Sequence, residues 1–299
     1  MKKFNIILFI PAQERRNTPY SGDKSAARHD AFISYFPKNT RFYLATYEDQ
    51  YIAEDIFLPD YIRVWYSWER YLGKQVHADL ILWMSGRVES QKIYLNPIKD
   101  FCKNKTCIES IFPHATLHSH ICHSYEEIIH CFHKISSCIK VYKPCFGSRA
   151  IGIVMSETLP KQEELVGEYP YLIQNFFDTS AGFEWHLWIH DFRVVILNGT
   201  ITGSFLRIAP PWVMTANVAT WASIIDFEWK IPSSIKKIIG EVEVYISKLY
   251  PERYYSIDVW IWQNWEVKIF ELNSNPMLST PSIIEALAQH IIKNILKIS

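Results

Sequence analysis

The first part of the chain alternates between short apolar runs and polar segments with helical character. Residues 5–9, 41–46 and 78–84 are apolar runs that predict buried strands, and residues 24–35 predict a helix. Continuous apolar runs separated by helical segments are typical of a parallel sheet that is covered on both faces. Residues 1–95 therefore predict a small α/β lobe.

Farther along, the pattern changes to paired strands joined by short turns. Residues 193–197 and 200–208 flank Asn198-Gly199, and this dipeptide between alternating apolar runs is the strongest short-range signal of a hairpin. Residues 255–277 predict a second hairpin. The other predicted elements are strands at residues 141–142, 152–155 and 171–177, helices at residues 231–249 and 281–298, and an aromatic loop at residues 212–229.

The hairpin at residues 255–277 carries oxygen ligands. Asp258 lies on its first strand, and Glu271 and Asn273 lie near the end of its second strand. Side chains two residues apart in a strand share a face, so Glu271 and Asn273 point the same way, and Asp258 can lie opposite them. Two carboxylates and an amide suit Mg²⁺, although an ordinary hairpin with a polar end has the same pattern.

A short glycine-containing loop precedes these hairpins. Gly147, Ser148 and Arg149 lie between two predicted strands, and such a loop can place backbone N–H groups against phosphate oxygens. Lys143, just before the loop, supplies a point charge for the same anion. No helix follows the glycines, so the loop is neither a Walker motif nor a dinucleotide fingerprint, and a plain hairpin is the alternative.

Two arginines mark one end of the Asn-Gly hairpin. Arg193 begins its first strand and Arg207 nearly ends its second, so the two guanidinium groups can approach each other. Two neighbouring cations are unfavourable unless anions lie between them, and phosphate and carboxylate match the guanidinium fork. A local carboxylate partner is the alternative, and Asp191 is close in sequence.

Histidine and cysteine are concentrated in one segment. Residues 102–145 hold all six Cys, and residues 114–133 hold six of the eleven His. No Cys-x-x-Cys pair or finger spacing occurs, so single thiols and a surface helix at residues 124–137 are the preferred interpretation. The alternative is a zinc site that uses His130 and His133 from one helix face.

Composition narrows the function classes. Lys+Arg and Asp+Glu both number 31, so the overall charge lacks the basic excess that nucleic acids and anionic membranes require. The apolar run at residues 6–11 is shorter than a typical signal sequence, and no stretch is as long as a membrane span. We therefore expect a cytoplasmic protein with reduced thiols and with neither a nucleic-acid nor a membrane partner.

The lysine and glycine loop, the paired arginines and the Asp…Glu-x-Asn set occur in an order that resembles the ATP-grasp superfamily. The resemblance covers roughly residues 96–299 and is strongest to the branch of glutathione synthetase, the ribosomal-protein glutamate ligase and D-alanine–D-alanine ligase. It implies an α+β / α/β ATP-grasp fold in which antiparallel strands of the C-terminal lobe bind magnesium. The implied parts are a pre-ATP-grasp lobe at residues 1–95 and an ATP-grasp domain at residues 96–299, with a lid lobe at about 138–177 and a catalytic lobe at about 178–299.

The resemblance also implies roles for individual residues. The Asp191-Phe192-Arg193-Val194 segment matches a D-x-R-V motif whose arginine faces the phosphates, and Arg207 fits a later arginine of the pattern. The implied nucleotide contacts are Lys105, Lys143, Gly147, Ser148, Arg149, Gln174 and Asn175; the implied metal ligands are Asp258, Glu271 and Asn273; and the substrate candidates are Arg87, Asn217 and Ser282.

Three positions depart from the family pattern. Asn175 stands where the adenine hinge commonly carries Glu, and Ser256 stands where D-alanine ligases carry Arg. Ala219-Thr220-Trp221 replaces the glycine pair that often follows the Asn217 position, which leaves the acceptor site open. Of these departures, Ser256 argues against D-alanine ligase itself.

The implied activity is ADP-forming ligation of a carboxylate to an amine through an acyl phosphate. ATP and two Mg²⁺ ions are the implied cofactors, and the substrates are amino acids, peptides or a protein side chain. An ATP-binding regulatory protein and an ATP-grasp kinase are the alternatives. The sequence leaves a homo-oligomer open.

Overall fold

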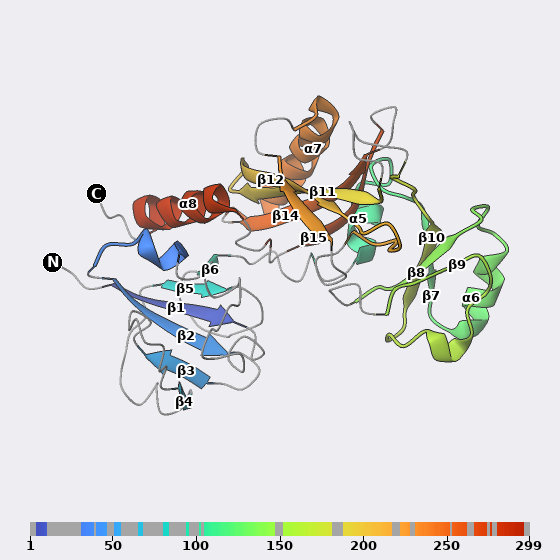
Figure 1. Ribbon diagram of the computed structural model, residues 1–299, viewed down its shortest axis with the longest axis horizontal. Coiled ribbons are helices and arrows are strands. Elements are labelled where there is room, and N and C mark those ends of the chain that lie inside the picture. The colour runs from blue at the N-terminus through green and yellow to red at the C-terminus, as the bar shows by residue number, and fades with distance from the viewer. Residues whose placement is uncertain are drawn as a thin grey trace. The chain divides into compact units, whose positions relative to one another are not determined.

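The computed structural model of this chain divides into two compact units (Figure 1). The first unit comprises residues 1–97, 252–254 and 275–299, and the second comprises residues 98–251 and 255–274. The structure describes residues 4–10, 31–38, 40–46, 51–54, 65–67, 80–83, 94–95, 102, 105–146, 152–180, 188–216, 222–227, 231–251, 253–261, 266–273, 276 and 280–295.

The first unit contains a six-stranded sheet in the order β4-β3-β2-β1-β5-β6. β1 pairs in parallel with both β2 and β5, and β5 pairs in parallel with β6, whereas β3 and β4 add an antiparallel extension. The predicted parallel core is confirmed. The strands are β1 (Phe4–Ile10), β2 (Thr40–Thr46), β3 (Tyr51–Glu54), β4 (Trp65–Ser67), β5 (Leu80–Trp83) and β6 (Tyr94–Leu95).

Helix α8 (Pro281–His290) also belongs to the first unit. Thr280 is its N-cap, with the side chain accepting from the Ile283 N–H, and Pro281 occupies the first turn, where its missing N–H costs nothing. A π-helical turn, Ile291–Ile295, follows. The predicted helix at residues 281–298 is therefore confirmed in type, with α-helical geometry only over its first part.

The second unit contains two antiparallel sheets, and the smaller has the order β7-β10-β8-β9. Helix α6 packs against it and buries Ile128 and Cys131 with Tyr142 and Tyr171. Ser124 caps this helix by accepting from the Glu127 N–H, as predicted. The elements are β7 (Ser119–Cys122), α6 (Tyr125–Phe132), β8 (Lys140–Pro144), β9 (Val154–Ser156), a 3₁₀ turn (Gln162–Glu164) and β10 (Tyr171–Asn175).

The larger sheet has the order β13-β12-β11-β14-β15. One of its faces packs against helix α7, whose Ile235, Ile239, Val242 and Ile246 join the main apolar core of this unit. Each such fully buried aliphatic side chain contributes about 1.5–3 kcal/mol. The elements are α5 (Lys105–Ile111), β11 (His190–Leu197), β12 (Thr200–Ile208), β13 (Ser223–Asp226), α7 (Ser233–Leu249), β14 (Tyr254–Ile261) and β15 (Val267–Asn273).

Both predicted hairpins are confirmed in their strands. Asn198 and Gly199 have φ of 48° and 85°, the left-handed pair that a tight β11–β12 turn requires. In the β14–β15 hairpin, Asp258 lies opposite Glu271, whereas the next residue, Val259, lies opposite Ile269. Phe270 is therefore an extra residue in β15, and it forms a β-bulge.

Some elements were missed or misjudged. The loop predicted at residues 212–229 contains β13, and the His-rich segment contains β7. Both are four-residue edge strands whose stability comes from pairing with β12 and β10, so their own pattern is weak. The helix predicted at residues 124–137 ends at Phe132.

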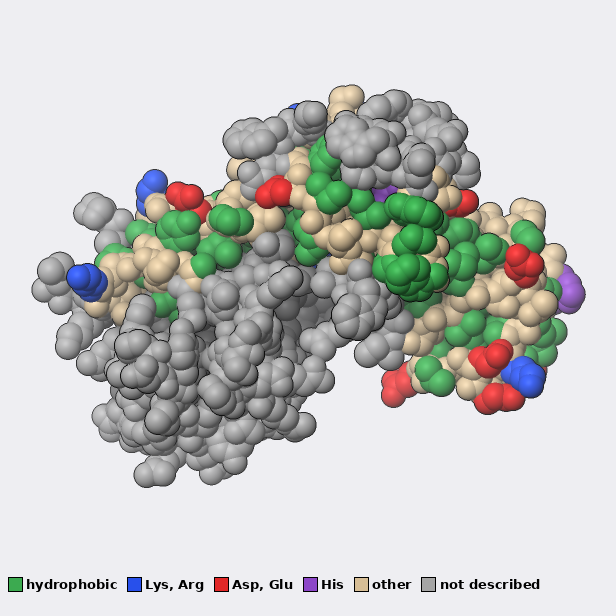
Figure 2. Space-filling model, viewed as in Figure 1, with side chains coloured by type: hydrophobic (Ala, Val, Ile, Leu, Met, Phe, Trp, Pro, Cys, Tyr) green, Lys and Arg blue, Asp and Glu red, His purple; other side chains and the backbone are tan. Residues whose placement is uncertain are grey.

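Apolar side chains also reach the surface of the second unit, as Figure 2 shows. Trp212 is 81% exposed, the highest value among the large apolar side chains that the structure describes. Over the described residues, no helix combines the length and the apolar character needed to span a membrane.

Candidate functional site

The alternation of β11, β14 and β15 gives the larger sheet a polar face. Phe192, Val194 and Ile257 point into the α7 core. Their neighbours Arg193 and Asp258 therefore point to the opposite face. Asp191 shares that face, as does Arg207, which lies opposite Asp191 on β12.

Five residues on this face form what we call the arginine–aspartate cluster: Asp191, Arg193, Arg207, Asp258 and Asn273. Arg193 donates to both carboxylate oxygens of Asp258, from Nε at 2.6 Å and from Nη2 at 2.5 Å. Arg207 donates to both carboxylate oxygens of Asp191, from Nε at 2.6 Å and from Nη2 at 2.7 Å. Its Nη2 also donates to Asp258 Oδ2 at 2.8 Å. Asn273 Nδ2 adds a bond to the same oxygen at 3.0 Å.

The charges of this cluster cancel, two guanidinium groups against two carboxylates. Burial alone would raise the pKa of Asp258, but Arg193 and Arg207 together lower it. Burial raises the pKa of Asp191 to about 7, because Arg207 only partly offsets the loss of water and the nearby Asp258 charge. Asp191 and Asp258 raise the pKa of Arg207 despite its burial. Asp191 is therefore the carboxylate of this cluster that takes up a proton first.

This difference predicts a pH dependence of stability. The pKa of Asp191 is raised in the folded state, so between the unfolded value near 3.8 and about 7 the folded chain binds more protons. We expect the wild-type free energy of unfolding, relative to that of Asp191→Asn, to fall as pH rises through this window and then to level off. Urea titrations of both proteins at pH 5, 6, 7 and 8 measure the difference. A difference that stays constant with pH would contradict the assignment.

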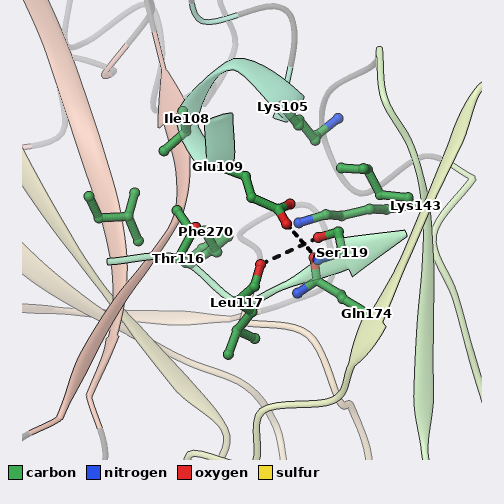
Figure 3. Close-up of a pocket in the computed structure, with 11 residues that line it drawn as sticks. Lys105, Ile108, Glu109, Thr116, Leu117, Ser119, Lys143, Gln174 and Phe270 are labelled. Atoms are coloured by element: carbon green, nitrogen blue, oxygen red, sulfur yellow. Dashed lines mark hydrogen bonds between the residues drawn. The ribbon is translucent and has the colours of Figure 1, made fainter. Parts of the chain in front are cut away.

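A pocket lies between α5, the smaller sheet and β15 (Figure 3). About 270 Å³ of space lies between these residues, a figure that includes open solvent at the mouth of the pocket. Lys105 Nζ donates to the Pro144 carbonyl at 3.1 Å, while Lys143 and Gln174 point inward from β8 and β10. The lining residues are Lys105, Ile108, Glu109, Thr116, Leu117, Ser119, Lys143, Leu172, Gln174, Ile269 and Phe270.

Electrostatics connects this pocket with the polar sheet face. Burial lowers the pKa of Lys143 to about 8, and the negative charge of Glu271 opposes that shift. Burial also lowers the pKa of Lys105, and Glu271 again opposes it. Glu271 is therefore close enough for its charge to affect the pKa of both lysines. In the chain it directly follows Phe270, which lines the pocket.

An aromatic stack supports the β15 side of the pocket. Phe270 stacks on Trp260 with ring centroids 4.6 Å apart, and Trp260 stacks on Phe177 at 5.5 Å. Phe177 follows β10, so the stack joins the two sheets of this unit. The bulge turns Phe270 toward Trp260 while Glu271 stays opposite Asp258.

The side chains on β14 and β15 offer carboxylate and amide oxygens, the types of ligand atom that Mg²⁺ prefers. Asp258 and Glu271 lie directly opposite each other, and Asn273 lies two residues beyond Glu271. Asp258 Oδ2 already accepts three hydrogen bonds, whereas Oδ1 accepts one. Glu271, the amide oxygen of Asn273 and Asp258 Oδ1 are therefore the groups with capacity for a cation.

The His/Cys segment gives no support to a zinc site. Within the described part of the chain, no group of three or more His, Cys, Asp or Glu residues is placed to hold a metal ion. His130 and His133 are exposed at the end of α6. All six Cys are free thiols.

The predicted site residues fall into three groups. Lys105, Lys143 and Gln174 meet in the pocket, and Asn175 is exposed at the end of the same strand as Gln174. Arg193, Arg207, Asp258 and Asn273 meet in the cluster, with Glu271 opposite Asp258. Ser282 belongs to the first unit, where its hydroxyl bonds to Thr280 Oγ1 at 2.9 Å. Gly147, Ser148, Arg149, Asn217 and Arg87 lie outside the described residues.

Of the pocket residues, the sequence predicted only Lys105, Lys143 and Gln174, and two of those it missed are Glu109 and Phe270. Glu109 lies four residues after Lys105 on α5, so the helical repeat places both on one face, a signal present in the sequence. Phe270 is the extra residue of the bulge, and its only mark in the sequence is the three-residue spacing between the core residues Ile269 and Leu272, where strict alternation has two.

No family model and no curated protein matches this sequence. Several solved structures share its fold over nearly the whole chain. The D-Ala:D-Ser ligase VanG of Enterococcus faecalis is 11% identical, with a TM-score of 0.68 and 99% of each chain covered. The D-alanine–D-alanine ligase of Bacillus anthracis complexed with ATP is 12% identical, with a TM-score of 0.62, covering 100% of this chain and 98% of that one.

A RimK-domain ATP-grasp protein of Sphaerobacter thermophilus is also similar. It is 9% identical, with a TM-score of 0.58, covering 96% of this chain and 99% of that chain. The fold class and the resemblance inferred from the sequence are confirmed at the level of the fold. The chain therefore has the ATP-grasp fold, like the D-alanine–D-alanine ligases and the RimK-type proteins.

Proposed function

We propose that this protein is an ATP-dependent ligase that joins a carboxylate to an amine. The observation that carries the proposal is the meeting of Lys105, Lys143 and Gln174 in one pocket beside a face that bears Glu271 and the arginine–aspartate cluster. Such a site offers apolar walls for a base, cations for phosphates and oxygen ligands for a metal. The described ligase structures of the same fold support this assignment.

Each part has a task in this proposal. The base of ATP occupies the pocket, and Lys105 and Lys143 balance the charge of its phosphates. Glu271, Asn273 and Asp258 would hold Mg²⁺, which supplies charge neutralisation at the phosphates when it is bound. Arg193 uses two of its five N–H groups within the cluster and Arg207 uses three, so both retain donors for a phosphoryl group.

The proposed reaction has two steps. A substrate carboxylate oxygen attacks the γ-phosphorus of ATP, the bond to the β,γ-bridging oxygen breaks, and ADP leaves. An amine then attacks the acyl carbon of the acyl phosphate, which releases phosphate and a proton. Phosphoryl transfer requires positioning and charge stabilisation more than a protein nucleophile, and the buried arginines supply N–H donors held in fixed positions.

Lys143→Met should weaken ATP binding by about 10- to 100-fold, because it removes a charge-assisted hydrogen bond in a buried pocket. Titration calorimetry with a non-hydrolysable ATP analogue and Mg²⁺ measures the affinity. Lys161 lies between β9 and the 3₁₀ turn, and its side chain is 75% exposed. The control variant Lys161→Met should therefore bind the analogue like the wild type. Equal affinities for all three proteins would place the nucleotide elsewhere.

Phosphate release tests the ligation itself. Pools of amino acids and short peptides should stimulate ADP and phosphate formation from ATP, with formation of an amide product detected by mass spectrometry. ADP formation with the phosphate retained on a product would indicate a kinase. ATP binding without stimulation by any acceptor would indicate a regulatory nucleotide-binding protein.

A further inference from the structure

Glu109 brings a carboxylate into a pocket that otherwise offers two lysines. Its Oε1 accepts from the Ser119 N–H at 2.7 Å and lies 3.2 Å from His118 Nδ1. Among the described residues both contacts use Oε1, which leaves the lone pairs of Oε2 for a ligand. Figure 3 shows the carboxylate pointing toward Lys143 and Gln174 at the centre of the pocket. A carboxylate repels phosphate, so Glu109 suits a ligand group that donates a hydrogen bond.

The walls of the pocket identify that group as part of a planar base. Ile108, Leu117, Leu172, Ile269 and Phe270 supply apolar surface, which suits an aromatic ring and does not suit a triphosphate. Polar side chains make up the rest of the lining, and among them Glu109 and Gln174 point toward the centre of the pocket, where they can meet the edge of a ring.

We propose that Glu109 selects adenine by accepting a hydrogen bond from its 6-amino group. This inference rests on the proposed function, since it assumes that a purine nucleotide occupies the pocket. Adenine presents a donor at position 6 beside the N7 acceptor, whereas guanine and hypoxanthine present a carbonyl oxygen there. An ionised carboxylate only accepts, so it favours the amino group and repels the carbonyl.

Competition between ATP and ITP tests the inference, because the two purines differ in the 6-substituent and in the proton at N1. Wild-type protein should bind ATP at least about tenfold more tightly than ITP. Glu109→Gln should reduce that ratio about tenfold, because the amide still accepts from the Ser119 N–H but can also donate to a carbonyl. Glu163→Gln, at a glutamate that is 74% exposed, serves as the control and should keep the wild-type ratio.

The outcomes separate the two levels of the proposal. No ATP binding by the wild type would overturn the proposed function together with the inference. ATP binding with equal affinity for ITP, or a ratio that Glu109→Gln leaves unchanged, would overturn the role of Glu109 alone. The wild-type comparison needs no variant, so the test holds even if Glu109→Gln fails to fold.

Discussion

Replacing Asp258 by Asn should lower the free energy of unfolding by about 3 kcal/mol. The Asp258 side chain is fully buried and accepts four hydrogen bonds, two from Arg193 and one each from Arg207 and Asn273. Without its charge, two buried guanidinium groups share the single carboxylate of Asp191. Breaking a buried ion pair by removing one partner costs far more than an exposed pair contributes, because a charge is left without compensation.

Urea denaturation at pH 8, where Asp191 is ionised, measures this loss. Asp226→Asn is the matched control, since Asp226 is an exposed aspartate on the edge strand of the same sheet, and its effect should stay within about 0.5 kcal/mol. A loss below about 1 kcal/mol for Asp258→Asn would mean that water reaches the cluster and that its ion pairs stabilise little.

Glu271→Gln should instead abolish turnover and leave stability nearly unchanged. Glu271 lies opposite Asp258 at the junction of the cluster and the pocket, where its charge acts on Lys105 and Lys143. We expect ATP-dependent phosphate release to fall by about 10²-fold or more, because a carboxylate is lost where the phosphates and their cation are proposed to bind. The free energy of unfolding should change by less than about 0.5 kcal/mol, since Glu271 is only partly buried.

Glu266→Gln provides the comparison, because Glu266 immediately precedes the same strand. Glu266 is 48% exposed and pairs with Lys268 at 3.3 Å, so its replacement should leave both turnover and stability near wild type. Wild-type turnover in Glu271→Gln would remove Glu271 from the proposed metal set. Together with Asp258→Asn, this pair of variants compares the contribution of a fully buried carboxylate to stability with the proposed contribution of a partly buried one to turnover.

Local signals in the sequence were enough to predict much of the fold. Asn198-Gly199 specified one hairpin, because few residues adopt positive φ, and the Glu271-x-Asn273 alternation identified two side chains on one face. The apolar runs of the first unit predicted a parallel core, because strands that are buried on both faces are apolar at every position and do not alternate with polar residues.

The carboxylate partners of the two arginines could not be predicted from local patterns in the sequence. Arg193 and Asp258 are 65 residues apart in sequence, and they meet because β11 and β14 are neighbours in the sheet. Alternation tells which side chains share a face of one strand, but it does not tell which strands lie side by side. The arginines were therefore expected to face anionic ligands, with Asp191 as the local alternative, whereas the folded chain holds them on Asp191 and Asp258.

The extra residue in β15, Phe270, separates two features of the hairpin: the pairing of Asp258 with Glu271 and the aromatic side chain that stacks on Trp260. If Phe270 were deleted, Ile269 would still pair with Val259, and Glu271 would still pair with Asp258 in an uninterrupted ladder. The oxygen ligands would keep their places while the aromatic wall and its stack on Trp260 disappeared. A change of one residue in length can therefore remove the aromatic wall of the pocket without moving Asp258 or Glu271 out of register.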